Sequence, residues 1–130
     1  MKAIKIPFLA FILLLVTFGI CSGDKILKDK FDNLVLKYKA LYMLETKVIN
    51  EIEGITPEAV KAFTEAKKVM DTTEPDKLTK DEKIIILTAA YLSERLKGLY
   101  CQLALIHWNM HQTEEEAYNT KKQLDSEREA

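Results

Sequence analysis

Two histidines stand four residues apart, a spacing that places both imidazoles on one side of a helix. His107 and His111 in this arrangement can bind one metal ion, with Glu114 or Glu115 as a third ligand. The pattern of zinc proteases has a glutamate directly after the first histidine, whereas this chain has Trp108. We therefore expect two partly exposed histidines here and not a metal centre.

The segment 71–82 has the length of a helix–loop–helix calcium loop, with Asp71 first and Glu82 last. Pro75, at the fifth position, has no ligating side chain, and Asp76 replaces the glycine that permits the turn at the sixth. Two interpretations stay open. Either Asp71, Asp76 and Glu82 form a weak site for a divalent cation, or the segment is a polar linker whose Glu82 caps the next helix.

Nucleophilic catalysis finds little support in the sequence. Cys101 and His107 are six residues apart, so within one helix they point in different directions and cannot touch. The sequence has no serine elbow, no glycine-rich phosphate loop and no cysteine–histidine zinc cluster. We expect a non-enzymatic protein without a cofactor. Cys101 is either a buried small hydrophobe, which its apolar setting favours, or half of an intermolecular disulfide.

The first 23 residues have the pattern of a secretory signal peptide. Lys2 and Lys5 precede an apolar run over 6–20, and the small residues Cys21 and Gly23 predict cleavage after Gly23. The run is shorter than the roughly 20 residues that span a bilayer. We therefore expect a secreted protein with a single helical domain, residues 24–130. The alternative, for a bacterial chain, is a lipoprotein anchored through Cys21.

The balance of charge argues against nucleic acid as a partner. The whole chain has a net charge of −1, and cleavage after Gly23 removes two lysines and no acid, which makes the secreted form more negative. This balance predicts neither a basic surface that binds nucleic acid nor a basic face that binds anionic lipid. No stable membrane span is expected after cleavage.

Apolar residues recur at alternating three- and four-residue spacing, which is typical of amphipathic helices. A first helix is predicted over 25–53, with Glu45 as the one polar interruption of its apolar face. Gly54 is expected to end it, and Thr56 with Pro57 to cap and start a second helix that reaches Met70. The residues 71–77 are expected to form a loop.

Thr79 and Glu82 have the spacing of a capping box, which predicts the start of a third helix. This helix is the most apolar and should be the central, buried one. Its heptad rows are Ile85, Leu92, Leu99, Ile106 and Ala89, Leu96, Leu103, Met110. Thr113 and Glu116 repeat the capping-box spacing before the polar segment 114–128, which either continues the third helix or folds back.

Together these patterns predict an all-α fold, a small bundle of three long helices plus a polar C-terminal helix. The surplus of apolar residues on the third helix favours a binding protein that acts through an apolar helical surface, with a protein partner or a second copy. The alternatives are a lipid-like ligand held between helices and the weak cation site above. The residues expected to line the surface are Tyr38, Tyr42, Phe63, Tyr91, Leu99, Leu103 and Ile106.

The sequence ITPEAVKAF at 55–63, followed by LTKDEK at 78–83, resembles the second half of the SXP/RAL family of nematode secreted antigens. Members of that family have a proline–glutamate helix start and a later leucine–threonine–lysine or arginine helix opening. The resemblance implies a small secreted helical protein that is immunogenic in a host. It also implies cation binding, which is suggested for some members, with Asp71, Asp76 and Glu82 as the nearest candidates here.

Overall fold

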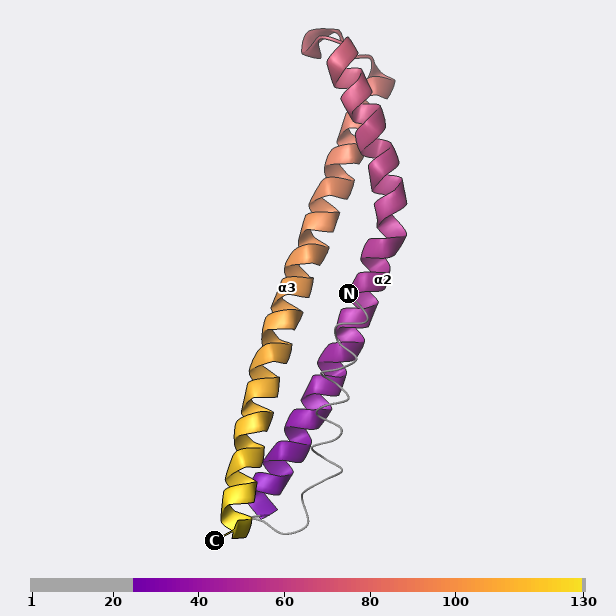
Figure 1. Cartoon of the computed structure of the whole chain (residues 1–130). Helices are drawn as coiled ribbons and strands as arrows, with labels where there is room; N and C mark the ends of the chain where they lie inside the picture. The colour runs from indigo at the N-terminus through magenta and orange to yellow at the C-terminus, as the bar shows by residue number, and fades with distance from the viewer. Residues whose placement is uncertain (1–24, 130) are drawn as a thin grey trace. The chain divides into compact units, whose positions relative to one another are not determined.

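The computed structural model describes residues 25–129, which form two long α-helices, α2 over Lys25–Thr72 and α3 over Lys80–Glu129 (Figure 1). A short 3-10 helix, η1, spans Pro75–Lys77 in the linker between them. No strand occurs in this range, so the predicted all-α fold is confirmed. The prediction of three long helices plus a polar C-terminal helix is wrong, because the described chain forms two. The predicted signal peptide, including Cys21, lies outside the described residues.

The predicted break at Gly54 does not occur, because α2 continues through it. Gly54 does not take the left-handed conformation that closes a helix. Thr56 is not an N-cap, because its hydroxyl donates to the carbonyl oxygen of Ile52, 2.6 Å away and one turn earlier in the same helix. Pro57 lies inside α2 and does not open a second helix.

The apolar face of α2 explains why the helix does not stop at Pro57. Ile52, Ile55 and Ala59 are all buried, and their three- and four-residue spacing is unbroken across this point. A proline inside a helix costs about 3 kcal/mol. Burial of one isoleucine side chain stabilises by about 1.5–3 kcal/mol, so a continuous face outweighs one unfavourable position.

The start of α3 follows the predicted capping box. The backbone N–H of Thr79 donates to Oε1 of Glu82 at 3.0 Å, and the backbone N–H of Glu82 donates to Oγ1 of Thr79 at 3.2 Å. The hydroxyl of Thr73 donates to Oε2 of Glu82 at 3.1 Å. Hydrogen bonding to the carboxyl group of Glu82, from the Thr79 backbone first and then from the Thr79 and Thr73 side chains, lowers its pKa. The linker covers 73–79 and not the predicted 71–77, because α2 reaches Thr72 and α3 begins at Lys80.

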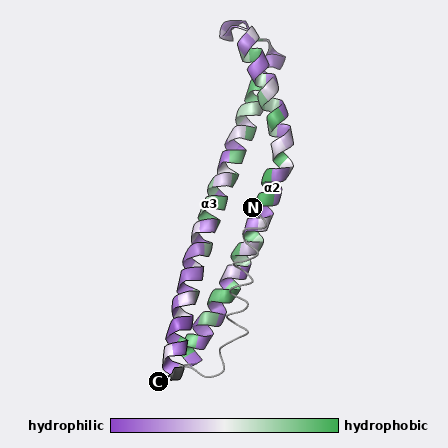
Figure 2. Ribbon diagram, in the orientation of Figure 1, coloured by the Kyte–Doolittle hydropathy of each residue, from purple (hydrophilic) through white to green (hydrophobic). Residues whose placement is uncertain are grey.

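The polar C-terminal segment continues α3 and does not form a separate helix. Thr113 is buried inside α3 and its hydroxyl donates to the carbonyl oxygen of Asn109 at 2.7 Å, so it is not the cap of a new helix. Figure 2 shows α3 becoming mostly hydrophilic toward its C-terminal end. Ala117, Thr120 and Leu124 nevertheless keep one face buried, which explains the continuation.

The described chain comprises two compact units. Unit 1 combines the part of α2 up to Thr46 with the part of α3 from Leu105, and unit 2 contains Lys47–Ala104. Within each unit, a segment of α2 lies beside a segment of α3 that runs in the opposite direction (Figure 1). The core of unit 1 consists of Phe31, Leu34, Val35, Tyr38, Met110, Ala117 and Leu124.

In unit 2 the buried face contains several alanines. Its buried apolar residues are Val48, Ile49, Ile52, Ile55, Ala59, Ala62, Ala66, Ala89, Leu92, Leu99 and Leu103. The prediction that the third helix is buried on several sides is wrong, since Ile84, Leu87 and Tyr91 are exposed. Among the described residues α3 has only α2 to pack against, and one neighbouring helix covers only one face.

Replacing the fully buried Phe31 with alanine is expected to lower the free energy of unfolding by about 3–5 kcal/mol, because the change leaves a cavity in the core of unit 1. Urea denaturation followed by circular dichroism measures the loss. Leu36→Ala on the same helix is the control, because Leu36 is 63% exposed, and it should change stability by no more than about 0.5 kcal/mol. Equal losses in both variants would contradict the assignment of the buried face.

Candidate functional site

A buried pair of titratable side chains lies in unit 1, where Glu45 of α2 meets His107 of α3. Glu45 is only 2% exposed, and its Oε2 atom is 2.6 Å from Nε2 of His107. This distance is that of a close ion pair, although its geometry is not that of a regular hydrogen bond. His107 has a side chain that is 33% exposed. His107 therefore places a ring nitrogen against a buried carboxyl group while part of its side chain keeps contact with solvent.

Tyr38 lies two turns before Glu45 on the same face of α2. Its phenol oxygen is buried and has no hydrogen-bond partner among residues 25–129. Burial first, then the charges of Glu114 and Glu45 and the neighbouring Tyr42, raise the pKa of Tyr38 to about 12. The phenol is therefore neutral near neutral pH and is a poor general acid or base there. This cluster holds one charge pair inside a helix contact, and it does not have the features of a reaction centre.

The side chains of the two histidines are 33% and 66% exposed, but they lie inside α3 and not at its end, and they have different partners. His107 pairs with Glu45, while Nε2 of His111 lies 3.6 Å from Oε1 of Glu115. Within the part of the chain that the structure describes, no group of three or more His, Cys, Asp or Glu side chains is arranged to hold a metal ion.

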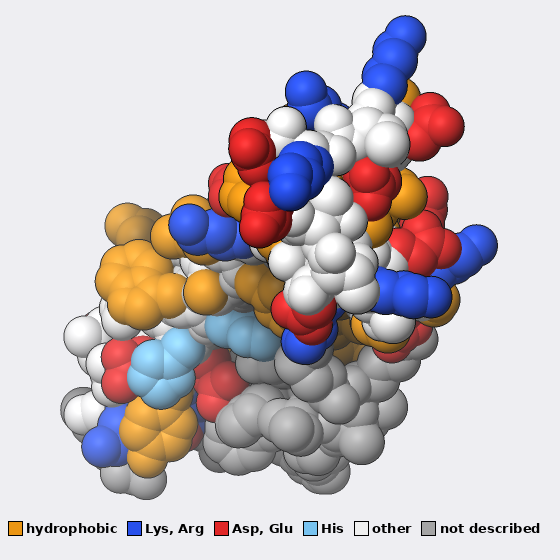
Figure 3. Space-filling model, turned by 90° about the horizontal axis from the view of Figure 1, so that it is seen from above, with side chains coloured by type: hydrophobic (Ala, Val, Ile, Leu, Met, Phe, Trp, Pro, Cys, Tyr) orange, Lys and Arg blue, Asp and Glu red, His pale blue; other side chains and the backbone are white. Residues whose placement is uncertain are grey.

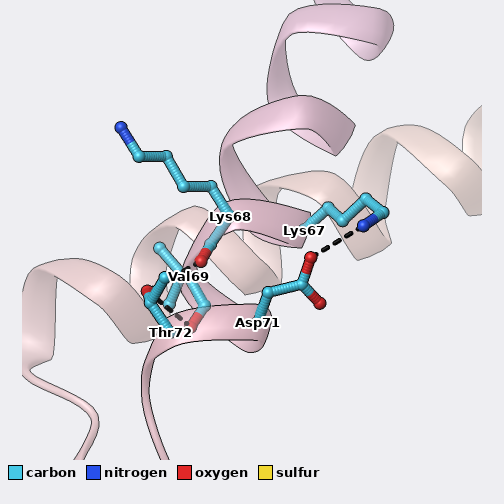
Figure 4. A network of polar contacts seen from close by, with 5 residues as sticks. All are labelled: Lys67, Lys68, Val69, Asp71 and Thr72. Carbon is cyan, nitrogen blue, oxygen red and sulfur yellow. Dashed lines mark hydrogen bonds and ion pairs between the residues drawn. The ribbon is translucent and has the colours of Figure 1, made fainter.

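The three linker acids that we considered for a cation also have separate surroundings. Asp71 accepts a hydrogen bond from Nζ of Lys67 at 2.7 Å, and Figure 4 shows the two side chains turned toward each other on the last turns of α2. Asp76 is exposed in η1. Glu82 caps α3, as the polar-linker interpretation predicted.

Cys101 is exposed, so its expected burial is wrong. The physical reason is helical phase. Leu99 and Leu103 occupy the buried face, and Cys101, two residues from each, falls on the opposite side of α3. An intermolecular disulfide through Cys101 stays a prediction.

The residues that we predicted to form a partner surface fall into three groups. Tyr38, Leu99 and Leu103 are buried in contacts between the helices, and Tyr42 and Ile106 are half-buried. Only Phe63 and Tyr91 are exposed. The apolar rows of the sequence therefore identify mainly the face that the chain covers itself.

An apolar hollow in unit 2 has a different set of lining residues. It has a volume of about 400 Å³ and lies between α2 and α3, lined by Phe63, Ala66, Met70, Ile86, Ala89, Ala90 and Ser93. Of these residues, only Phe63 was predicted from the sequence to line a partner surface. The signal that could have revealed the hollow is the cluster of small residues at 89, 90 and 93, opposite Ala66, because short side chains leave space between two helices.

Large apolar side chains are also exposed outside the hollow. In the space-filling view of Figure 3, hydrophobic side chains lie at the surface among charged ones. On α3, the side chains of Leu87 and Tyr100 are exposed. None of the helices in residues 25–129 combines the length and hydropathy that crossing a membrane requires. These side chains therefore call for an explanation other than a membrane-spanning helix.

Replacing His107 with leucine is expected to lower the free energy of unfolding by about 3 kcal/mol, because it removes the polar side chain that lies against the buried carboxyl group of Glu45. Glu45→Leu is expected to change stability by no more than about 1 kcal/mol, since it restores an apolar face and His107 can reach solvent. The double variant His107→Leu/Glu45→Leu should recover most of the stability that His107→Leu loses. Urea denaturation of all three tests this order, and a larger loss from Glu45→Leu than from His107→Leu would refute it.

Replacing Tyr38 with phenylalanine is expected to leave the free energy of unfolding unchanged or to raise it by up to about 2 kcal/mol, because the buried phenol oxygen has no hydrogen-bond partner among the described residues. The pKa of Tyr38 is raised from 10.0 to about 12. The contribution of this shift to the free energy of unfolding is therefore fully present below pH 10.0 and is lost as the pH rises toward 12. Urea denaturation in this pH range should therefore show a steeper loss for the unsubstituted chain than for Tyr38→Phe. A loss of stability in Tyr38→Phe at neutral pH would indicate a hydrogen bond to this oxygen.

Comparisons of the chain with protein-family models, with curated proteins and with solved structures find no match. The resemblance to the SXP/RAL antigens therefore stays a prediction. Of the two stretches that carry it, LTKDEK at 78–83 does open a helix, whereas ITPEAVKAF at 55–63 lies within α2.

Proposed function

We propose that this chain is a secreted, non-enzymatic binding protein that acts through an apolar helical surface in unit 2. The observation that carries the proposal is the hollow between α2 and α3, whose lining has Ser93 as its only polar residue. Two of its lining residues, Phe63 and Met70, are exposed. Water at such a surface is readily displaced by an apolar partner.

The mode of binding that fits this hollow is an amphipathic helix laid into a groove. Ala66, Ala89 and Ala90 contribute short side chains, which let a partner approach the backbones of both helices. Phe63 and Met70 are exposed at the same site and can pack against the inserted side chains. A partner helix would supply apolar residues at three- and four-residue spacing, as in other helix-in-groove complexes.

A small apolar ligand is the second candidate. The volume of about 400 Å³ falls in the range of roughly 300–1,000 Å³ that is usual for small-molecule sites. Such sites cover most of their ligand, however, and here both Phe63 and Met70 remain exposed. This exposure favours a protein partner over a carried molecule.

Photo-crosslinking in the medium of the cells that produce the protein tests the proposal. With benzoylphenylalanine in place of Phe63, we expect an adduct whose mass includes a second polypeptide. The same group in place of Lys68, which is exposed on α2 and does not line the hollow, should give little or none. Ala90→Glu puts a carboxylate in the hollow and should reduce the adduct at least about tenfold, since burial of an uncompensated charge is costly.

Thr88→Glu is the matched control for that change, because Thr88 is exposed on α3 outside the hollow. It should leave the adduct at position 63 unchanged. An adduct with a lipid-sized mass would favour the small apolar ligand. If Ala90→Glu does not reduce any adduct at position 63, both candidates are contradicted.

A further inference from the structure

The outward face of α2 in unit 1 has an apolar patch that no described residue covers. Leu36, Met43 and Leu44 are 63%, 72% and 50% exposed, and Ala40 is exposed between them. Their spacing of three, four and seven residues places them on one side of the helix. Tyr38 and Glu45, on the other side, are buried. We define Leu36, Ala40, Met43 and Leu44 as the outer patch.

Lysines border the outer patch on both sides. Around the helix axis, Lys37 and Lys39 lie on opposite sides of the centre of the outer patch. Both are exposed. Lys47, also exposed, follows at the C-terminal end. The single acid between residues 33 and 47 is Glu45, which is buried with His107. The exposed charge of this stretch is therefore entirely positive.

The acids nearest to the outer patch lie at its edge. Asp29 and Asp32, seven and four residues before Leu36, lie on the same side of α2 beyond the N-terminal end of the patch. Asp29 and Glu116 line a surface hollow together with Lys30 and Lys37. A surface that approached the outer patch itself would meet its apolar side chains, with Lys37 and Lys39 on the flanks and the acids toward its N-terminal end.

We propose that the outer patch docks on an anionic lipid surface. The four apolar side chains would enter the region between headgroups and acyl chains, and the lysines would lie alongside with their ammonium groups at the phosphates. The net charge of −1 does not reveal this face, because it sums the charges of the whole chain. The proposal concerns a different surface from the hollow of unit 2 and does not depend on it.

Cosedimentation with lipid vesicles tests this proposal, using residues 24–130, which contain every helix and packing contact described above. We expect binding to vesicles of phosphatidylcholine with phosphatidylglycerol, weaker binding to phosphatidylcholine alone, and loss at high salt. Lys37→Glu/Lys39→Glu should weaken binding at least about tenfold, because each lysine near an anionic surface contributes about fivefold. Leu36→Asp/Met43→Asp should abolish it.

Matched controls separate this face from general effects. Lys61→Glu/Lys68→Glu makes the same change in charge on α2 in unit 2, and Leu87→Asp changes an exposed leucine of α3. Both should retain nearly full binding. Equal weakening by the control pair, or no preference for anionic vesicles, would overturn the proposal. So would a concentration-dependent dimer, seen by native mass spectrometry, that Leu36→Asp/Met43→Asp dissociates, because the patch would then bind a second copy.

Discussion

The structure depends on one constraint: every third or fourth residue of each helix must be buried against the other helix. On α2, Ile52, Ile55 and Ala59 keep this rule. They do so although Gly54 and Pro57 lie between them. On α3 it is kept by the buried Leu92, Leu99 and Leu103, with the half-buried Leu96 between the first two, and then continues into a segment that is polar elsewhere. Because one helix covers only one face of another, the same rule leaves the remaining apolar side chains exposed.

Glu45 is the exception within this buried face. A buried carboxyl group in such a position destabilises the contact unless a polar partner lies opposite, and Nε2 of His107 lies 2.6 Å from Oε2 of Glu45. If the two segments of unit 1 slid by one turn, the carboxylate would stay buried and the imidazole would move away. A buried polar pair of this kind favours one register over its neighbours, as polar residues do in the seams of coiled coils. An apolar pair at these positions would not discriminate in this way.

Local patterns in the sequence predicted the all-α fold, the capping box at Thr79 and Glu82, and the buried rows of α3. They failed at Gly54 and Pro57, where local stop signals compete with a buried face that only the partner helix creates. Glu45 was recognised as a polar interruption, but its pairing with His107 joins residues far apart in sequence. The hollow of unit 2 was missed, because the small residues at 89, 90 and 93 indicate it only together with the residues of α2 that they face.

The two exposed apolar surfaces differ in shape and in charge, and this difference limits what each can bind. The hollow of unit 2 is concave, lies between two helices and has Ser93 as its only polar lining residue, so it can enclose the side chains of another helix. The outer patch is the convex side of a single helix and cannot enclose anything. A convex apolar surface bordered by Lys37 and Lys39 gains most from a medium that deforms around it and carries negative charge, which is the character of a lipid interface. The shape of each surface therefore points to a different class of partner, even though both consist of the same kinds of apolar residues.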